Sequence, residues 1–307
     1  MALQLIPNNT NVNFIGFRFV TFFIAGFFIL LGSIGYFKGL NFGIDFKGGH
    51  SIEVHLKDEP NLDDIRDKLH ALHIGEVAVQ QLATSKDLLI KVELQEGDDS
   101  KQTTAIDSVK KVIGENQDYR KISTVGPKIG TELANNALKA VLLALAAMLI
   151  YIAVRFEWQF AVCAIVALFH DCLAIVSLFC WTPLEFSENS VIAILITAGY
   201  SINDTIVIFD RIRENIKRFK RMELAELINK SLNETLSRTI MTASTTLLAL
   251  LALYFTGGPV ISSFSLPIII GITIGSFSSI CLASPLLLYM HLPRHDKDQK
   301  EPIVINV

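Results

Sequence analysis

Near its C-terminal end the chain has 55 consecutive residues, Thr239 to Pro293, without an aspartate, glutamate, lysine or arginine. About 20 predominantly apolar residues cross the hydrocarbon core of a bilayer, so this stretch is long enough to cross twice. An ordinary water-soluble domain does not accommodate so long an uncharged run. Hydrophobic residues make up 51% of the 307 residues, which also excludes intrinsic disorder. The sequence therefore predicts an integral membrane protein.

Six stretches of the chain are long and apolar enough to be membrane helices. A cleaved signal peptide is disfavoured for the first, because its apolar run exceeds the usual length of about 7–15 residues and lacks a small-residue cleavage site. The predicted division is a tail 1–16, a first helix 17–37, an external domain 38–132, a membrane core 133–290 and a tail 291–307. Within the core we expect spans at 133–154, 158–183, 189–209, 239–255 and 264–290, and a basic loop at 211–238.

The basic residues of the short connections predict the orientation of the helices. Connection 211–238 carries eight Lys or Arg against four Glu, whereas connections 182–188 and 256–263 carry no Lys or Arg. Because six spans bring both termini to the side of the basic connection, both are predicted to be cytoplasmic. The 38–132 segment then lies outside the membrane on the far side, with 17 acidic and 13 basic residues. All four cysteines lie outside it, so we expect no disulfide framework there.

The external segment alternates strand and helix patterns. Residues 51–56, 77–82, 88–94 and 119–125 are typical of strands, while 61–72 and 103–113 place apolar residues at helical spacing. The resulting order β-α-β-β-α-β is that of the ferredoxin-like split motif. The predicted fold class is therefore a polytopic α-helical membrane protein with six membrane helices. An α+β ferredoxin-like domain is inserted between the first and second of them.

Signals for an enzyme in this external domain are weak. The glycine-rich run Gly43–His50 lacks the Lys-Ser/Thr pair of a phosphate loop, and it leads from a membrane helix into a strand. Asp67, His70 and His73 have a spacing that could suit a metal, but a solvated helix face explains them better. We therefore expect a binding or mechanical element, with no cofactor, no metal and no nucleic acid as partner.

Asp204 is the most informative single residue, because it lies inside a predicted span. It precedes Asp210, at the charged end of that span, by six residues, or about 9 Å along a helix. A charged carboxylate inside a bilayer costs about 2.5 kcal/mol or more, and it persists where it faces other helices or water. Thr197, Tyr200 and Ser201 share its helix face. A hydrogen bond between helices is one interpretation, and a proton-carrying carboxyl is the favoured one.

Arg238 begins the fifth span, and Thr242 and Thr245 continue its face. It is either an anchor at the cytoplasmic surface or a cation that reaches Asp204. In the second case it would favour the ionised carboxylate. A helix shift that made and broke this contact would then couple proton binding to movement.

Asp171 is also intramembrane, and the sequence leaves open whether it makes a packing contact or relays protons. The adjacent His170 is not expected to face it, since neighbouring residues of a helix point in different directions. Gly271 and Gly275 have the small-xxx-small spacing of closely packed membrane helices.

Taken in order, several segments resemble the SecF family, the smaller membrane subunits of bacterial SecD–SecF protein-translocation complexes. The likeness extends over about residues 14–290, and its two small departures, Ala243 and Phe277, do not involve Asp204 or Arg238. The segments that carry it are 41–49, 125–130, 155–158, 170–171, 198–207, 210–214 and 233–239.

The resemblance implies one six-helix half of a resistance-nodulation-division membrane core. It implies a protein translocase subunit, not an enzyme, that uses proton-motive force for export across the bacterial inner membrane. Asp204 and Arg238 would conduct protons, with Asp171 as a further candidate. Implied partners are a SecD-like subunit, the SecYEG channel, the translocating polypeptide and membrane lipid, with YajC as a further candidate. Two alternatives stay open: half of a small-molecule efflux transporter, and a non-transporting scaffold.

Overall fold

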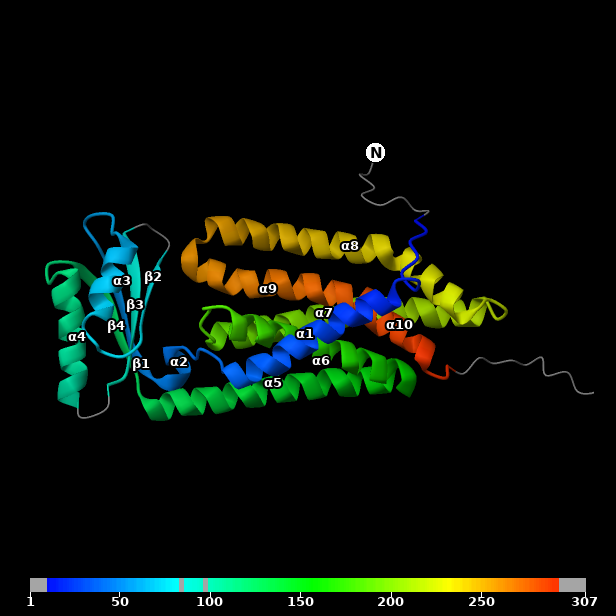
Figure 1. Cartoon of the computed structure of the whole chain (residues 1–307), viewed down its shortest axis with the longest axis horizontal. Helices are drawn as coiled ribbons and strands as arrows, with labels where there is room; N and C mark the ends of the chain where they lie inside the picture. Colours follow the sequence, from blue (N-terminus) through cyan, green and yellow to red (C-terminus); the bar gives the residue numbers. More distant parts are fainter. Residues whose placement is uncertain (1–9, 83–85, 96–98, 293–307) are drawn as a thin grey trace, which may run out of the picture.

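A six-helix bundle and a small sheet domain at one of its ends make up the computed structural model, which describes residues 10–82, 86–95 and 99–292 (Figure 1). All six bundle helices are long and apolar enough to cross a membrane, as predicted. They are α1 (Arg18–Lys38), α5 (Pro127–Arg155), α6 (Trp158–Trp181), α7 (Glu188–Arg218), α8 (Leu224–Thr256) and α9 (Gly258–Ser278). The last helix continues through a π-helical turn, η1 (Ser279–Ala283), into α10 (Ser284–Leu286) and η2 (Leu287–Tyr289).

The sheet domain confirms the predicted β-α-β-β-α-β order. Its sheet has the order β2-β3-β1-β4, and every neighbouring pair is antiparallel. Ile52 lies opposite Ile90 and Ile122 in this register. Asn61 caps the helix Leu62–His70, which carries Asp67. His73, with a φ of 51°, lies beyond the end of this helix. The elements are α2 (Ile44–Lys47), β1 (Gly49–His55), α3 (Leu62–His70), β2 (Val77–Gln81), β3 (Asp87–Glu93), α4 (Asp99–Ile113) and β4 (Asp118–Val125).

Glycines make the close junction between the sheet domain and the bundle possible. Gly48 has a φ of +89°, a conformation that favours glycine. A Cβ on Gly49 would lie 2.6 Å from the carbonyl oxygen of Val92, and a Cβ on Gly130 of α5 would lie 2.7 Å from that of Phe46. The glycine-rich run therefore serves close backbone packing where the chain enters and leaves the sheet domain.

A third contact holds the sheet domain on the bundle. The backbone of Phe42 bridges that of Phe186, in the connection between α6 and α7. Nearby, Lys91 of β3 pairs with Glu185 at 3.1 Å, and both side chains are largely buried. The domain is thus attached to the bundle through β3 as well as through its two chain crossings.

The bundle helices are buried to very different extents. More than half of the apolar stretch is buried in α6 and in α7, against 6% in α5 and 11% in α8. The buried face of α8 includes Thr239 and Ala243. Its outward face is exposed in this chain and includes large apolar residues, among them Met241, Leu248 and Phe255. Between them lies a row of charged, hydroxyl and small residues: Arg238, Thr245, Ala249, Ala252 and Thr256.

The prediction of a loop over 211–238 is wrong. Helix α7 extends to Arg218 and α8 starts at Leu224, so only a short turn at 219–223 separates them. Most of the charges that suggested a loop lie on the outer faces of these helices, and Lys220, Arg221 and Glu223 lie in the turn. On the inner faces Leu227, Ile228 and Leu232 are buried in one cluster with residues of α7. The connection predicted at 256–263 is also shorter in the structure, because α8 ends at Thr256 and α9 begins at Gly258.

Candidate functional site

Asp171 of α6 is fully buried and has polar partners on three helices. Its Oδ1 atom lies 2.9 Å from Nδ1 of His170, on its own helix. Its Oδ2 atom lies within hydrogen-bond distance of the hydroxyls of Ser201, on α7, and Ser278, on α9, the latter at 2.8 Å. The carboxyl group therefore joins the three most deeply buried helices of the bundle.

The prediction that His170 does not face Asp171 is wrong. The rule describes the directions in which adjacent side chains leave a helix. Nδ1 lies close to its own backbone, so the short carboxyl group that follows can turn back to it. The imidazole is fully buried, and its edge-on neighbour is the ring of Phe28 in α1, with centroids 6.1 Å apart. Its Nε2 atom has no hydrogen-bond partner among the described residues.

Asp204 of α7 is nearly as buried as Asp171, at 3% exposure, but it has far fewer polar contacts. Its hydrogen bond comes from the hydroxyl of Ser276, at a long 3.3 Å. Arg238 of α8 is close enough to act on it electrostatically. Within the described ranges, however, no nitrogen–oxygen contact of 4.0 Å or less joins the two residues. The carboxyl group is thus withdrawn from solvent without being saturated by the protein.

A short serine segment on the last membrane helix, Ser276, Ser278 and Ser279, contacts both carboxyl regions. Ser276 reaches Asp204 and Ser278 reaches Asp171, while Ser279 lies 2.8 Å from the hydroxyl of Thr205 and donates to the carbonyl of Ser201 at 3.1 Å. Sequence reasoning missed this segment. Its signal was the close spacing of hydroxyl residues within an otherwise apolar span, followed by the π-helical turn that begins at Ser279.

Gly271 and Gly275 lie where α9 passes close to α7. A Cβ on Gly271 would lie 2.3 Å from the hydroxyl of Thr197, and one on Gly275 would lie 2.9 Å from the Cβ of Ser201. This close approach brings the serine segment within reach of α6 and α7. The three polar residues predicted to share a face with Asp204 therefore have different neighbours. Thr197 faces Gly271, and Ser201 faces Asp171. The hydroxyl of Tyr200 has no hydrogen-bond partner in the described parts of the chain.

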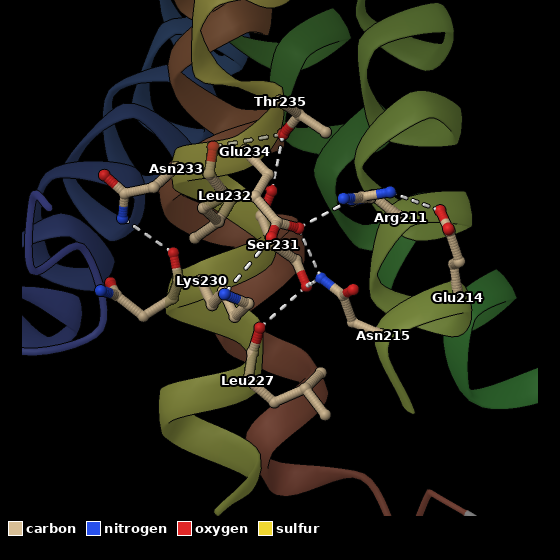
Figure 2. A network of polar contacts seen from close by, with 11 residues as sticks. Arg211, Glu214, Asn215, Leu227, Lys230, Ser231, Leu232, Asn233, Glu234 and Thr235 are labelled. Carbon is tan, nitrogen blue, oxygen red and sulfur yellow. Dashed lines mark hydrogen bonds and ion pairs between the residues drawn. The ribbon is translucent and has the colours of Figure 1, made fainter. Parts of the chain in front are cut away.

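Polar contacts hold the C-terminal end of α7 and the N-terminal end of α8 together in a clamp (Figure 2). This clamp lies at the end of the bundle away from the sheet domain (Figure 1). Arg211 pairs with Glu234 at 2.7 Å, and Asn215 donates to Glu234 at 2.7 Å and to Ser231 at 2.9 Å. Arg211 follows Asp204 by about two helical turns, and Glu234 precedes Arg238 by about one. The clamp therefore contributes to the alignment of the helix of Asp204 with the helix of Arg238.

Hydroxyl, carboxyl and imidazole groups supply the chemistry of this region. No group of three or more metal-ligating side chains occurs among the described residues, and the four cysteines are unpaired. Thr242 and Thr245 donate to carbonyls of their own helix, which leaves the guanidinium of Arg238 as the charged group of that face. Each of the two buried carboxyls is hydrogen-bonded to serine hydroxyls, and a buried carboxyl group can bind and release a proton.

Comparisons with known proteins identify the family to which this chain is similar. A family model described as protein export membrane protein SecD/SecF, C-terminal, matches residues 105–292, and a model of the SecD/SecF GG motif matches residues 35–59. The protein translocase subunit SecF of Rickettsia bellii is 40% identical over 291 residues, covering 93% of this chain and 95% of its own length. The SecF of Rickettsia typhi is 41% identical over 93% of this chain and 94% of its own length.

Solved structures give the same result. The crystal structure of SecDF, a translocon-associated membrane protein from Thermus thermophilus, matches with a TM-score of 0.76 and 34% identity over 93% of this chain. A second SecDF structure, in a super-membrane-facing form, matches with a TM-score of 0.68 and 36% identity over 92%. This chain spans only 39% of either SecDF chain.

Proposed function

Because the chain belongs to the SecD/SecF family of protein export membrane proteins, we propose that proton movement through its helix bundle drives a step of protein export. Family membership makes it a multi-pass subunit of the export machinery in the inner membrane. Asp204 binds and releases the proton in this proposal, and Arg238 modulates it. Asp171 takes part as a further carboxyl group.

The environment of Asp204 is the observation that carries the proposal. A buried carboxylate with one long hydrogen bond and no paired cation is costly when ionised. A proton removes that cost, and so does the approach of Arg238. A small movement of α8 toward α7 would therefore release the proton, and the opposite movement would favour its return. Each elementary charge moved across the membrane supplies about 2.3 kcal/mol per 100 mV.

The exposed row on α8 supports a second membrane subunit as partner. Small and hydroxyl residues favour close packing of membrane helices, and a lipid-facing arginine is unfavourable. We assign the face of Arg238, Thr245, Ala249, Ala252 and Thr256 to a SecD-like subunit. This agrees with the 39% share of the SecDF chains that the present chain spans.

Orientation and the remaining partners extend the proposal. The base of α7 and α8 carries exposed Lys217, Arg218, Lys220 and Arg221, which supports a cytoplasmic position for this end and a periplasmic one for the sheet domain. The periplasmic domain would then act on the emerging polypeptide beside the SecYEG channel, with YajC as a further partner.

The test is protein translocation into proteoliposomes that contain the channel and a SecD-like subunit, with and without an imposed proton gradient. We expect Asp204→Asn to abolish the stimulation by the gradient while the variant still copurifies with its partner. The matched control is Asp210→Asn, because Asp210 lies on the same helix but pairs with Arg155 at a partly exposed position. Full gradient stimulation in Asp204→Asn would refute the carrier role.

A further inference from the structure

His170 is a buried titratable side chain for which the proposed function gives no role. We propose that His170 and Asp171 form a second proton-binding site, in which the proton is held on Oδ2 of Asp171 and hydrogen-bonded to Ser278. Only the use of this site in transport rests on the proposed function. The site itself rests on the hydrogen bonds around the two side chains.

The hydroxyl of Ser278 can satisfy Asp171 in both protonation states. It has one hydrogen and two acceptors within reach, Oδ2 of Asp171 at 2.8 Å and the carbonyl oxygen of Gly275 at 3.0 Å. When Asp171 is ionised, Ser278 donates to the carboxylate. When Oδ2 carries the proton, Asp171 donates to the oxygen of Ser278, which then donates to Gly275. Asp171 can therefore bind or release a proton while each of these groups keeps a hydrogen-bond partner.

The net charge of the buried pair favours the form in which the carboxyl group of Asp171 is protonated. An ionised Asp171 beside a neutral His170 would leave a net negative charge, and no lysine or arginine of the described residues pairs with Asp171. An imidazolium paired with the carboxylate would be neutral overall, but it would place a hydrogen on Nε2, which is buried without a partner. The neutral acid, with His170 protonated on Nδ1, leaves only the Nε2 lone pair unused.

In the part of the chain that the structure describes, no lysine or arginine forms an ion pair with Asp171. On its own helix Asp171 interacts with two titratable groups, His170 and Cys172. Helices α7 and α9 direct the hydroxyls of Ser201 and Ser278 toward it. The nearest titratable group farther along α7 is Asp204, one turn beyond Ser201. Serine hydroxyls bind both carboxyls: Ser201 and Ser278 bind Asp171, while Ser276 binds Asp204.

Infrared spectroscopy of the purified protein, reconstituted in lipid and exchanged into heavy water, tests the site directly. A protonated carboxyl group has a carbonyl band separate from that of a carboxylate. At neutral pH we expect Asp171→Asn to lose one such band, and Ser278→Ala to keep that band but shift it to higher wavenumber because the hydrogen-bond acceptor is gone. Asp204→Asn should leave this band in place. Loss of a carboxylate band in Asp171→Asn, with the carbonyl region unchanged, would overturn the proposal.

A measurement on the unaltered protein keeps the test valid if Asp171→Asn does not fold. Solid-state nuclear magnetic resonance of nitrogen-labelled histidine distinguishes the neutral tautomers from the imidazolium, and His170→Gln assigns the signal. We expect a neutral ring protonated on Nδ1 at neutral pH, whereas an imidazolium would contradict the proposal. Neither spectrum depends on translocation, so a failure of this site is distinguishable from a failure of Asp204 as the carrier.

Discussion

Asp171 and Asp204 are both buried carboxyls in the same bundle, yet they differ in their hydrogen-bond partners and in their surroundings. Asp171 has polar partners on three helices and lies where α6, α7 and α9 meet. Asp204 has one long hydrogen bond and lies beside α8, whose outer face is exposed in this chain. The first carboxyl is enclosed by the protein, and the second lies next to the surface that we assign to a partner.

The difference indicates that the two carboxyls have different main roles, one in stability and one in proton-coupled activity. A carboxyl whose lone pairs are satisfied in the folded state stabilises the arrangement of the helices around it. A carboxyl that is buried but poorly satisfied responds strongly to any group that approaches, such as Arg238. We therefore expect substitutions at Asp171 to act mainly on stability and substitutions at Asp204 to act mainly on proton-coupled activity.

The largest expected effect on stability is that of Asp171→Ala. It would leave the donors of His170 and Ser201 without their acceptor, and it would break the hydrogen bond to Ser278, whose hydroxyl can still donate to Gly275. At about 1 kcal/mol for each of these three bonds, the loss is about 3 kcal/mol in total. Asp204→Ala removes the acceptor of one long bond and should cost about 1 kcal/mol or less. Thermal unfolding of the purified protein in detergent measures both. Equal losses of stability would remove the contrast between the two sites.

A smaller effect is expected where α9 approaches α7. Gly271→Ala would force a methyl group against Thr197 and Ile175, both of which are buried, and should cost about 2 kcal/mol through overpacking. Gly26→Ala on α1 is the matched control, because its added Cβ would have no atom within 4 Å apart from its chain neighbours and the backbone of its own helix. If Gly271→Ala were as stable as Gly26→Ala in the same unfolding experiment, the close approach would not hold the serine segment in place.

The serines separate the two carboxyls more finely. Ser278→Ala removes a buried hydrogen bond of 2.8 Å and should destabilise the protein by about 1 kcal/mol. Ser276→Ala removes the 3.3 Å bond to Asp204 and should cost less than about 0.5 kcal/mol. In the translocation assay the order should reverse, with Ser276→Ala changing the gradient dependence more than Ser278→Ala. The same order in both assays would contradict the different roles proposed for the two carboxyls.

A small effect that depends on salt is expected at the clamp between the C-terminal end of α7 and the N-terminal end of α8. Glu234→Gln weakens the pairing with Arg211 and Lys230, whose side chains are partly exposed, so the loss should be about 0.5–1 kcal/mol and should shrink at high salt. Glu214→Gln, at a more exposed position in the same network, is the control and should be almost neutral. A loss above about 2 kcal/mol for Glu234→Gln would show that the clamp, rather than the buried site, sets the packing of α7 against α8.

Much of the architecture was predictable from the sequence, because each signal is local. The apolar spans require about 20 residues each, and the strands and helices of the sheet domain show their own periodicities. The capping residue Asn61 and the strand pattern around Ile52 need only their immediate neighbours along the chain. The basic segment 211–238 was misinterpreted for the converse reason, since its inner apolar face has meaning only when α7 and α8 lie side by side.

The sequence by itself determined that two carboxyls, Asp171 and Asp204, lie within apolar spans, because a charge among apolar residues is visible without any fold. Only the tertiary structure decided their partners. Ser276 and Ser278 come from a helix far along the chain, and their contacts depend on the close passage of α9 over α7. Hydrogen bonds act over about 3 Å, so no spacing along one helix could have shown which carboxyl is satisfied and which is left to respond.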